Sequence, residues 1–373
     1  MLKRTLTAVS VAALMAFAAG MARADIKIAI AGPITGDLAA FGEQLKRGAE
    51  MAVADINAKG GVNGEKLVIT VGDDRCDPKE ARSVAEKLAN QKVAFVAGHF
   101  CSGSSIPASE VYKEEGILQI SPASTNPVFT DRGLKNVFRV CGRDDQQGMV
   151  AGELIASKFK GKKVAVVHDK SQYGKGLADE TKKTLNKKGV KEAMYEAITP
   201  KEKDYSALVS KLKAGGIDVI YYGGYHPEAG LIVRQAREQG LKATLISGDA
   251  LVDKEFWAIA GKAGEGTLMT FDADPRKNAV AKEVVAKFKA AGYEPEGYTL
   301  YTYAAIQVFA QAAAKAKSTK LDALTKALHA NKFSTVLGTT EFDKKGDVKS
   351  PAYKVYEWKD GKYDYMTDKA GKS

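Results

Sequence analysis

Polar and aromatic side chains follow several predicted strands at the points where those strands end. The segment 98–104 reads GHFCSGS and opens a predicted helix, and the segment 121–127 reads SPASTNP. Backbone N–H groups and serine hydroxyls at the start of a helix suit a carboxylate. Later in the chain, Tyr173, Tyr225 and Asp249 each come just after a predicted strand. Hydroxyls and amides on one side, with a carboxylate and aromatic rings on the other, predict a site for a small zwitterion.

The sequence patterns of common enzymes are absent. There is no G-x-G-x-x-G after a strand, no Walker A sequence, no G-x-S-x-G and no H-E-x-x-H. The segment 173–176 (YGKG) is interpreted as a turn in front of a helix. Asp73 and Asp74 are not expected to form an acid/base pair, because neighbours in an extended segment point to opposite faces. A two-lobe α/β enzyme with its site in the same cleft is an alternative hypothesis, and it would require a positioned base.

The first 24 residues have the features of a cleaved signal peptide. Lys3 and Arg4 precede an apolar run over 9–19, and Ala22 and Ala24 supply an A-x-A cleavage signal. The run is too short to span a membrane, which needs about 20 apolar residues. The sequence therefore predicts an exported, periplasmic protein whose mature chain begins at Asp25.

The composition argues against nucleic acid as a partner. The formal net charge is +11, but the lysines are spread along predicted helices and often stand beside Glu or Asp. There is no arginine-rich tract and no platform of aromatic residues of the kind that nucleic-acid binding uses. The charge pattern favours a well-solvated protein surface.

The three cysteines are consistent with an oxidising compartment. Cys76 and Cys101 both follow predicted strands and could form a bridge. Cys141 is then left over and is interpreted as a buried small apolar residue. No C-x-x-C or paired Cys/His spacing occurs, so neither a metal nor a cofactor is expected.

Short β-branched runs alternate with longer amphipathic segments along most of the chain. The runs predict strands at 26–30, 67–71, 93–97, 118–120, 163–168, 194–198, 219–223, 244–247, 267–271, 340–342 and 353–358. The amphipathic segments predict helices at 41–58, 79–90, 104–114, 146–159, 177–188, 205–214, 228–239, 279–291, 298–315 and 320–329. Strands that alternate with helices imply parallel sheets covered on both faces. The expected fold class is therefore α/β, with two doubly wound lobes.

The alternating series divides near residues 141–143, and the helices after residue 271 must return to a lobe already begun. We therefore expect the chain to cross between the lobes more than once, which would make the junction a hinge. The predicted organisation is a signal peptide (1–24), an N-terminal lobe (25–142 plus 273–348) and a C-terminal lobe (143–272 plus 349–373).

Four segments resemble the branched-chain amino acid binding proteins of ABC importers, the Leu/Ile/Val-binding family. They are GHFCSGSSIPASEVY (98–112), SPASTNPVFTDRG (121–133), HDKSQYGKG (168–176) and YYGGYHPEAG (221–230). The similarity runs from Asp25 to about Tyr363. It implies a type I periplasmic binding protein: two Rossmann-like lobes joined by a three-strand hinge, with the ligand buried in the cleft.

The resemblance also implies roles for individual residues. Ser102 matches the serine that binds the α-carboxylate of the ligand. Ala123 matches a residue that gives backbone contacts, and Thr125 matches a hydroxyl and amide that hold the ligand head group. Tyr225 matches a cleft tyrosine of the second lobe, and Tyr173 an aromatic residue that covers the ligand.

Asp249 stands where the family usually has a glutamate that pairs with the ligand ammonium. A buried ammonium is very costly unless it is paired. In the same family, Cys76 and Cys101 match a disulfide.

The wall of the implied pocket departs from the family pattern. Phe100 replaces a leucine-type residue, Phe41 stands at a tyrosine position, Ala250 at a glycine, and Tyr298 where phenylalanine is common. The bulk of Phe100 should shrink the side-chain pocket, and Asp249 is one methylene shorter than glutamate. The expected ligand is leucine, isoleucine or valine, with proline, alanine or γ-aminobutyrate as the alternative.

The resemblance implies that the protein works by cleft closure and has one macromolecular partner. One lobe holds the carboxylate, and hinge rotation brings Tyr225 and Asp249 over the amine. The closed and open forms would present different surfaces to an ABC permease in the inner membrane, and the protein is expected to be a monomer. A sensor that docks to a chemoreceptor, or a receptor ectodomain of the same fold, is a further alternative.

Overall fold

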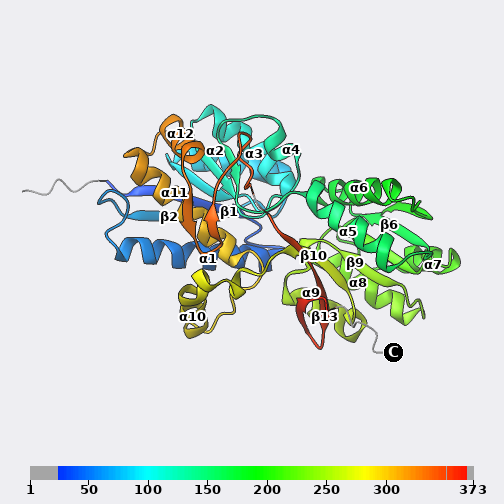
Figure 1. The fold of residues 1–373 in the computed structure, drawn as a ribbon. Helices are drawn as coiled ribbons and strands as arrows, with labels where there is room; N and C mark the ends of the chain where they lie inside the picture. The colour runs from blue at the N-terminus through cyan, green and yellow to red at the C-terminus, as the bar shows by residue number, and fades with distance from the viewer. Residues whose placement is uncertain (1–23, 350, 368–373) are drawn as a thin grey trace, which may run out of the picture.

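The computed structural model describes residues 24–349 and 351–367. The predicted signal peptide lies outside these residues, apart from Ala24. The described chain forms two α/β lobes that lie side by side (Figure 1). The expected fold class, two doubly wound lobes joined by a hinge, is confirmed.

The first lobe is built on a parallel sheet in the order β2-β1-β3-β4-β5. Its strands are β1 (Ile26–Gly32), β2 (Leu67–Asp73), β3 (Phe95–Gly98), β4 (Leu118–Ser121) and β5 (Val137–Arg139). Alternate residues of β1 point to opposite faces, and both faces are buried. Ala29 and Ala31 pack under α2 and α3, whereas Ile28 and Ile30 belong to the larger core on the other face. This two-sided burial explains why β1 is apolar from Ile28 onward.

The helices of this lobe include α1 (Ala39–Ala58), α2 (Pro78–Asn90), α3 (Ser102–Glu114), α4 (Val128–Asp131), α11 (Thr299–Ala316) and α12 (Leu321–Ala330). The helix α11 packs along α1, although more than 240 residues separate them in the sequence. The segment before α11 holds η3 (Pro275–Lys277), η4 (Ala279–Ala281) and α10 (Lys282–Ala290), and a small hairpin, β11 (Phe333–Thr335) and β12 (Gly338–Thr340), follows α12.

The second lobe contains a mixed sheet in the order β14-β13-β10-β9-β8-β6-β7. Its parallel strands are β6 (Val164–His168), β7 (Met194–Ala197), β8 (Val219–Gly223), β9 (Thr244–Ser247) and β10 (Leu268–Asp272). The late strands β13 (Tyr353–Lys359) and β14 (Lys362–Tyr365) add an antiparallel edge.

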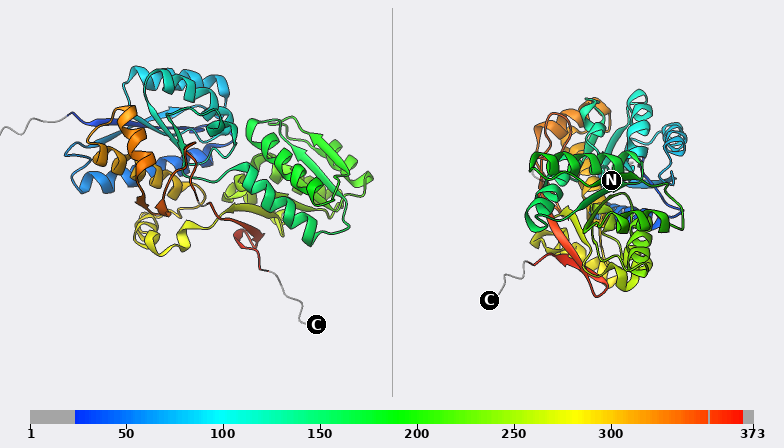
Figure 2. Two further views of the ribbon diagram at one scale, coloured as in Figure 1. Left: turned by 45° about the horizontal axis from the view of Figure 1, so that its top comes forward. Right: turned by 90° about the vertical axis from the view of Figure 1, so that its right-hand side faces the viewer.

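Helices cover both faces of this second sheet: in Figure 1, α5 and α6 lie above it and α8 and α9 lie below it, and Figure 2 shows the same lobe from two further sides. They are α5 (Asp144–Lys158), α6 (Gln172–Lys187), α7 (Ser206–Ala214), α8 (His226–Glu238) and α9 (Lys254–Ala260), with the short turns η1 (Asp249–Leu251) and η2 (Gly261–Gly264).

The chain passes between the two lobes three times: after β5, after β10 and before β13. A buried ion pair ties two of these crossings together. Arg139, at the end of β5, lies 2.7 Å from Asp347, and Arg143 in the first crossing contacts the same carboxylate at 2.7 Å. These ion pairs therefore hold the two crossings together at one end of the hinge.

Most predicted elements are present, with ends that differ by a few residues, but the start of α6 was predicted wrongly. The segment 173–176 is not a turn in front of a helix: it lies in the first turn of α6, which begins at Gln172. Ser171 caps the helix by accepting a hydrogen bond from the Gly174 N–H at 2.8 Å. Glycine is required there because a Cβ at Gly174 would lie 2.5 Å from the backbone oxygen of Gly223. Tertiary packing thus outweighs the low helix propensity of glycine.

Other differences occur in the shortest elements. The strands β5, β11 and β14 were not predicted, and the strand expected at 340–342 lies at 338–340, as β12. The helix expected at 279–291 is α-helical only over Lys282–Ala290. Three- and four-residue strands carry too few residues to show a period of two.

Candidate functional site

The segment between β3 and α3 carries two of the predicted site residues. The strand ends at Gly98, where a Cβ would lie 2.3 Å from the backbone oxygen of Ala31, so glycine lets the chain turn tightly there. Phe100 follows, and Ser102 is the first residue of α3. The Ser102 hydroxyl accepts a hydrogen bond from the backbone N–H of Asn126 at 3.2 Å. This hydroxyl therefore stands at a helix N-terminus, where a carboxylate is favoured.

The turn after β4 brings Ala123 and Thr125 to the same edge of the sheet. The Ser121 hydroxyl accepts hydrogen bonds from the N–H groups of Ala123 and Ser124, at 3.2 and 2.8 Å. The backbone oxygen of Thr125 accepts a hydrogen bond from the Asp144 N–H at 2.9 Å. The backbone of this turn is thus held by protein hydrogen bonds before any ligand is considered.

The second lobe contributes Tyr173, Tyr225 and Asp249. Tyr173 lies in the first turn of α6, Tyr225 precedes α8, and Asp249 opens η1. All three are buried or nearly so, and the rings of Tyr173 and Tyr225 lie 5.2 Å apart. Because β6, β8 and β9 are parallel, the segments that follow them meet at one edge of the sheet.

These residues enclose a small cavity between the lobes. It is lined by Phe100, Ser102, Ala123, Tyr173, Tyr225, Asp249 and Ala250, and its empty volume is about 200 Å³. Six of the nine predicted ligand-binding residues therefore surround a single cavity.

Phe41 and Tyr298 stand behind the cavity wall and fix the position of Phe100. The ring of Phe41 stacks on that of Phe100 at 4.4 Å, and the ring of Tyr298 meets it edge-on at 5.1 Å. Thr125 is also buried beside the site, with no hydrogen bond of normal geometry to its hydroxyl within the described chain. The three predicted residues that do not line the cavity thus lie around it.

Asp249 is held in place by two tyrosines from opposite lobes. The Tyr173 hydroxyl donates to one carboxylate oxygen at 2.8 Å, and the Tyr298 hydroxyl donates to the other. Burial raises the pKa of Asp249, and these two hydroxyls act in the opposite direction. A buried carboxylate of this kind favours a cationic partner such as an ammonium.

The sequence reasoning missed Asp144, a second buried carboxylate near the site. It is the first residue of α5 and is fully buried, and neither carboxylate oxygen makes a hydrogen bond of normal geometry with the described residues. Burial raises the pKa of Asp144 well above its usual value, and the nearby Asp249 adds to this effect. An acidic residue at the start of a helix is usually interpreted as a favourable contact with the helix dipole, so the sequence did not indicate that Asp144 is buried.

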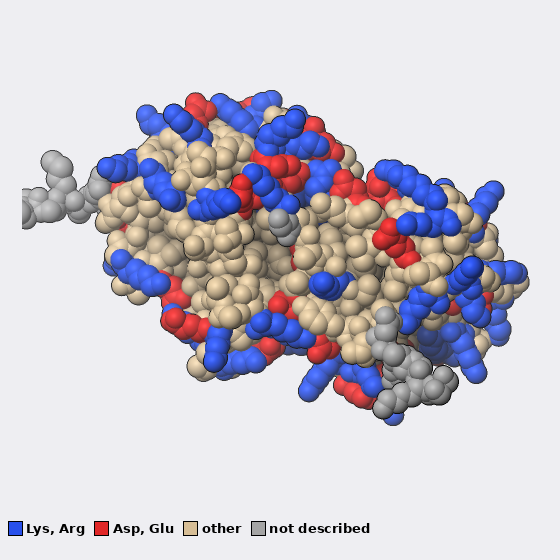
Figure 3. Space-filling view, viewed as in Figure 1, with Lys and Arg blue, Asp and Glu red and all other residues tan. Residues whose placement is uncertain are grey.

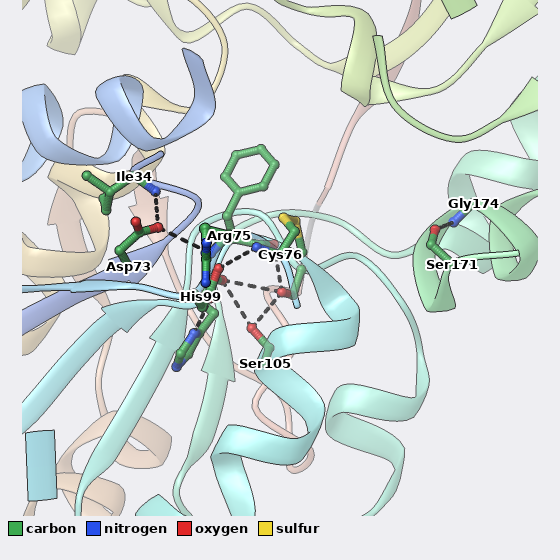
Figure 4. The surroundings of a disulfide bond; sticks show 12 residues. Ile34, Asp73, Arg75, Cys76, His99, Ser105, Ser171 and Gly174 are labelled. Atoms are coloured by element: carbon green, nitrogen blue, oxygen red, sulfur yellow. Dashed lines mark hydrogen bonds and ion pairs between the residues drawn. A yellow bond between two sulfur atoms is a disulfide. The ribbon is translucent and has the colours of Figure 1, made fainter. Parts of the chain in front are cut away.

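A buried hydrogen-bond network supports the loop that carries Phe100 and Ser102 (Figure 4). His99 contacts the Asp74 carboxylate at 2.5 Å and the Tyr112 hydroxyl at 2.9 Å. The backbone oxygen of His99 accepts hydrogen bonds from Ser105 and Ser121, at 3.1 and 2.7 Å.

The predicted disulfide joins Cys76 to Cys101 beside this network, with the two Cα atoms 5.5 Å apart. Cys141 is buried, as predicted, and burial raises the pKa of its thiol. Asp73 and Asp74 have separate partners, as their adjacency predicts: Asp73 accepts from Thr35, and Asp74 contacts His99.

Two carboxylates face each other at the mouth of the cleft. Asp253 caps α9, and Glu296 precedes α11 on the other lobe. Burial raises the pKa of Glu296 to about 7, and the charge of Asp253 adds to this, whereas Lys254 and Arg276 lower it.

This raised pKa predicts a pH-dependent stability. A carboxyl group whose pKa is higher in the folded than in the unfolded chain binds protons more strongly when folded. The contribution of Glu296 to the free energy of unfolding should therefore fall as the pH rises from about 4.5 to about 7. We expect Glu296→Gln to flatten this part of the stability profile, as followed by circular dichroism during heating. Glu294→Gln, at a half-exposed neighbouring carboxylate, is the control. A Glu296→Gln profile with the wild-type slope would contradict this prediction.

Two properties of the described residues limit the kind of site this can be. No group of three or more His, Cys, Asp or Glu side chains in residues 24–349 and 351–367 is arranged to hold a metal ion. Over the same residues, every helix is too short or too polar to cross a membrane. On the face seen in Figure 3, basic and acidic side chains are interspersed.

Comparisons with known proteins agree with this geometry. The family model described as periplasmic binding protein matches residues 25–362. The chain is 55% identical to Leu/Ile/Val-binding protein homolog 1 of Brucella melitensis, over 98% of this chain and 100% of that protein.

Solved structures give the same result. A leucine binding protein from Thermotoga maritima superposes with a TM-score of 0.85 at 29% identity, covering 92% of this chain and 98% of that one. A branched-chain amino acid transporter substrate binding protein from Streptococcus pneumoniae, in complex with isoleucine, gives 0.83 at 28% identity, covering 91% and 97%. The chain therefore belongs to the periplasmic binding protein family, among its Leu/Ile/Val-binding homologues, whose members are substrate-binding proteins of transporters rather than enzymes.

Proposed function

We propose that this chain is the exported substrate-binding protein of an ABC importer and that it captures a free amino acid by cleft closure. The observation that carries the proposal is the cavity between the lobes. One lobe supplies hydroxyls and backbone groups at a helix N-terminus, and the other supplies a buried carboxylate and aromatic rings. The two ends of this cavity complement the two charges of an amino acid.

Each end of the ligand has its own set of partners in this proposal. Ser102 binds the carboxylate, with Ala123 and Thr125 holding the head group. Asp249 pairs with the ammonium, while Tyr173 and Tyr225 cover the ligand from the second lobe. Since a buried charge is costly unless paired, both lobes must be in place before the ligand is fully bound.

The location, partners and lobe boundaries are part of the same proposal. We propose a periplasmic protein that is released from its signal peptide and delivers its ligand to an inner-membrane permease. The family description supports the periplasmic location, and the transporter named for the Streptococcus pneumoniae protein supports the permease. We propose that it works as a monomer without nucleic acid or cofactor. The three crossings support lobes formed by 25–142 plus 273–348 and by 143–272 plus 349–373.

The first candidate ligands are leucine, isoleucine and valine. The names of the relatives and the isoleucine bound to the Streptococcus pneumoniae protein support them. The second candidates are alanine, proline and γ-aminobutyrate, and a specific observation favours them. Phe100 lines the cavity with Phe41 and Tyr298 packed behind it, so the wall presents more bulk to a ligand than a leucine-type residue would.

A thermal-shift panel tests the proposed function. The mature protein is heated with leucine, isoleucine, valine, alanine, proline, γ-aminobutyrate and glutamate in turn. A ligand at about 100 times its dissociation constant stabilises the folded state by about 2.7 kcal/mol, which gives a clear rise in melting temperature. Absence of any rise across the panel would overturn the amino acid assignment.

Replacing Phe100 should change the ranking of these ligands. Phe100→Leu removes bulk from the cavity wall, so we expect leucine to gain affinity relative to alanine. A difference of about one to two methylenes in a hydrophobic pocket is worth about 1–3 kcal/mol, or about 10- to 100-fold in this ratio. Titration calorimetry with both ligands measures it. Phe309→Leu, at a buried residue of α11 that does not line the cavity, is the control for general loosening of the fold. An unchanged leucine-to-alanine ratio would show that Phe100 does not set the size of the side-chain pocket.

A further inference from the structure

Two hydrogen bonds cross the cleft without belonging to the cavity described above. The first joins Gln44 of α1 to Asp253, which caps α9. The Gln44 side-chain amide donates to the Asp253 carboxylate at 2.7 Å, and the exposed fractions of these residues are 1% and 2%. The second joins Asn126, next to Thr125, to the backbone oxygen of Gln172 at a distance of 2.8 Å.

Further hydrogen bonds in each lobe hold the two partners of the Gln44–Asp253 bond in place. The Gln44 side-chain oxygen accepts the backbone N–H of Tyr298 at 2.8 Å, so both polar ends of the amide are engaged. Gly297 allows this approach, since it has a φ of +53° and a Cβ there would lie 2.4 Å from the Gln44 oxygen. On the other lobe, the second carboxylate oxygen of Asp253 accepts the Glu255 N–H at 2.8 Å. Both partners are therefore held in fixed orientations.

The Asn126 bond has a similar construction on the other side of the cavity. The Asn126 side-chain oxygen accepts the Val128 N–H at 3.0 Å, which directs the amide nitrogen toward α6. A Cβ at Gly176 would lie 2.4 Å from that nitrogen, so glycine permits the contact. Figure 4 shows the start of α6, at Ser171 and Gly174, facing the loop of Cys76 and His99.

We propose that Gln44 and Asn126 are closure latches, positioning residues that hold the lobes together through bonds between protein groups alone. This inference rests on the proposed function, because it assigns the latches to the closed, ligand-holding form. Since neither bond reaches the ligand side chain, the latches set how long any ligand is retained, and they do not set which ligand is preferred.

A reversal of polarity at the first latch tests this. Gln44→Glu keeps the acceptor for the Tyr298 N–H but places a carboxylate against Asp253. The double variant Gln44→Glu/Asp253→Asn restores a donor and an acceptor, and asparagine retains the capping ability at position 253. The control is Glu43→Gln, whose carboxylate pairs with Arg47 within α1.

The main measurement is the dissociation rate of the bound amino acid, by stopped-flow fluorescence. We expect Gln44→Glu to raise this rate about tenfold or more for every ligand that binds, as for loss of a hydrogen bond to a charged group. The double variant should recover most of the wild-type rate, and Glu43→Gln should match wild type. An unchanged rate in Gln44→Glu, or no recovery in the double variant, would overturn the proposal.

Small-angle X-ray scattering of the mature protein without added amino acid separates this proposal from the proposed function. Gln44→Glu should show a larger radius of gyration than wild type, because the lobes part more readily. If no amino acid binds the wild-type protein, the comparison of the two radii of gyration is the only test of the latches, and equal radii would reject them. If amino acids bind but the rates do not change, the latches fail while the proposed function stands.

Discussion

Asp249→Asn should weaken the binding of every zwitterionic amino acid by about 100-fold or more. The substitution keeps the shape of the side chain but removes the negative charge that we pair with the ligand ammonium. Breaking a buried charge pair by removing one partner costs about 3–5 kcal/mol, because the other charge stays buried without compensation. Titration calorimetry of the variant with the ligands of the panel measures the loss.

Two observations make this prediction specific. Asp249 accepts hydrogen bonds from Tyr173 and Tyr298 on its two different oxygens. In asparagine the amide oxygen can accept from one of these hydroxyls, and the amide NH2 can donate to the oxygen of the other, so the wall should keep its shape. Asp322→Asn, at a carboxylate that is 82% exposed on α12, provides the matched control. Wild-type affinity in Asp249→Asn would remove the ammonium role from this residue. Asp144 would then be the remaining buried carboxylate near the site.

Removing the disulfide should produce the largest loss of stability. The bond closes a loop between residues 25 positions apart, which in the chain-entropy model is worth about 3 kcal/mol. Cys76→Ser/Cys101→Ser should therefore melt about 6–12 °C lower than wild type. Ligand affinity should fall as well, because Cys101 lies between Phe100 and Ser102 in the loop that lines the cavity.

A reducing agent supplies the control for this experiment. Dithiothreitol should lower the melting temperature of the wild-type protein toward that of the double variant and should leave the double variant unchanged. Equal melting temperatures for the oxidised wild type and the double variant would contradict the prediction.

The sequence predicts the architecture well where residue patterns are long. The alternation of strands and helices predicts both lobes, and the helices after residue 271 predict that the chain returns across the hinge. Where packing decides the local structure, the prediction fails. Gly174 and Gly176 read as turn residues, yet they lie in a helix because larger side chains would collide with Gly223 and Asn126.

The candidate site shows the same difference between residues that a sequence pattern reveals and residues whose position depends on packing. Ser102, Ala123 and Tyr225 stand in segments that follow predicted parallel strands, whose ends must meet. The resemblance to the Leu/Ile/Val-binding family then singled out these residues within the segments. Asp144 and Gln44 were not found. Asp144 lies just before the predicted helix 146–159, Gln44 lies within the predicted helix 41–58, and each looks like an ordinary polar residue. Each bonds to the other lobe, Gln44 to Asp253 and Asp144 to Thr125, and a local sequence pattern does not report contacts between lobes.

The central claim is that one cavity binds both charged ends of a free amino acid. Isothermal titration calorimetry of the mature protein with valine, alanine and leucine, and with their amides and N-acetyl derivatives, tests it most directly. We predict that at least one free amino acid binds with one-to-one stoichiometry, and that blocking either its carboxylate or its amine lowers affinity by about 100-fold or more. Equal binding of a free amino acid and its blocked derivatives, or no binding at all, would contradict the account.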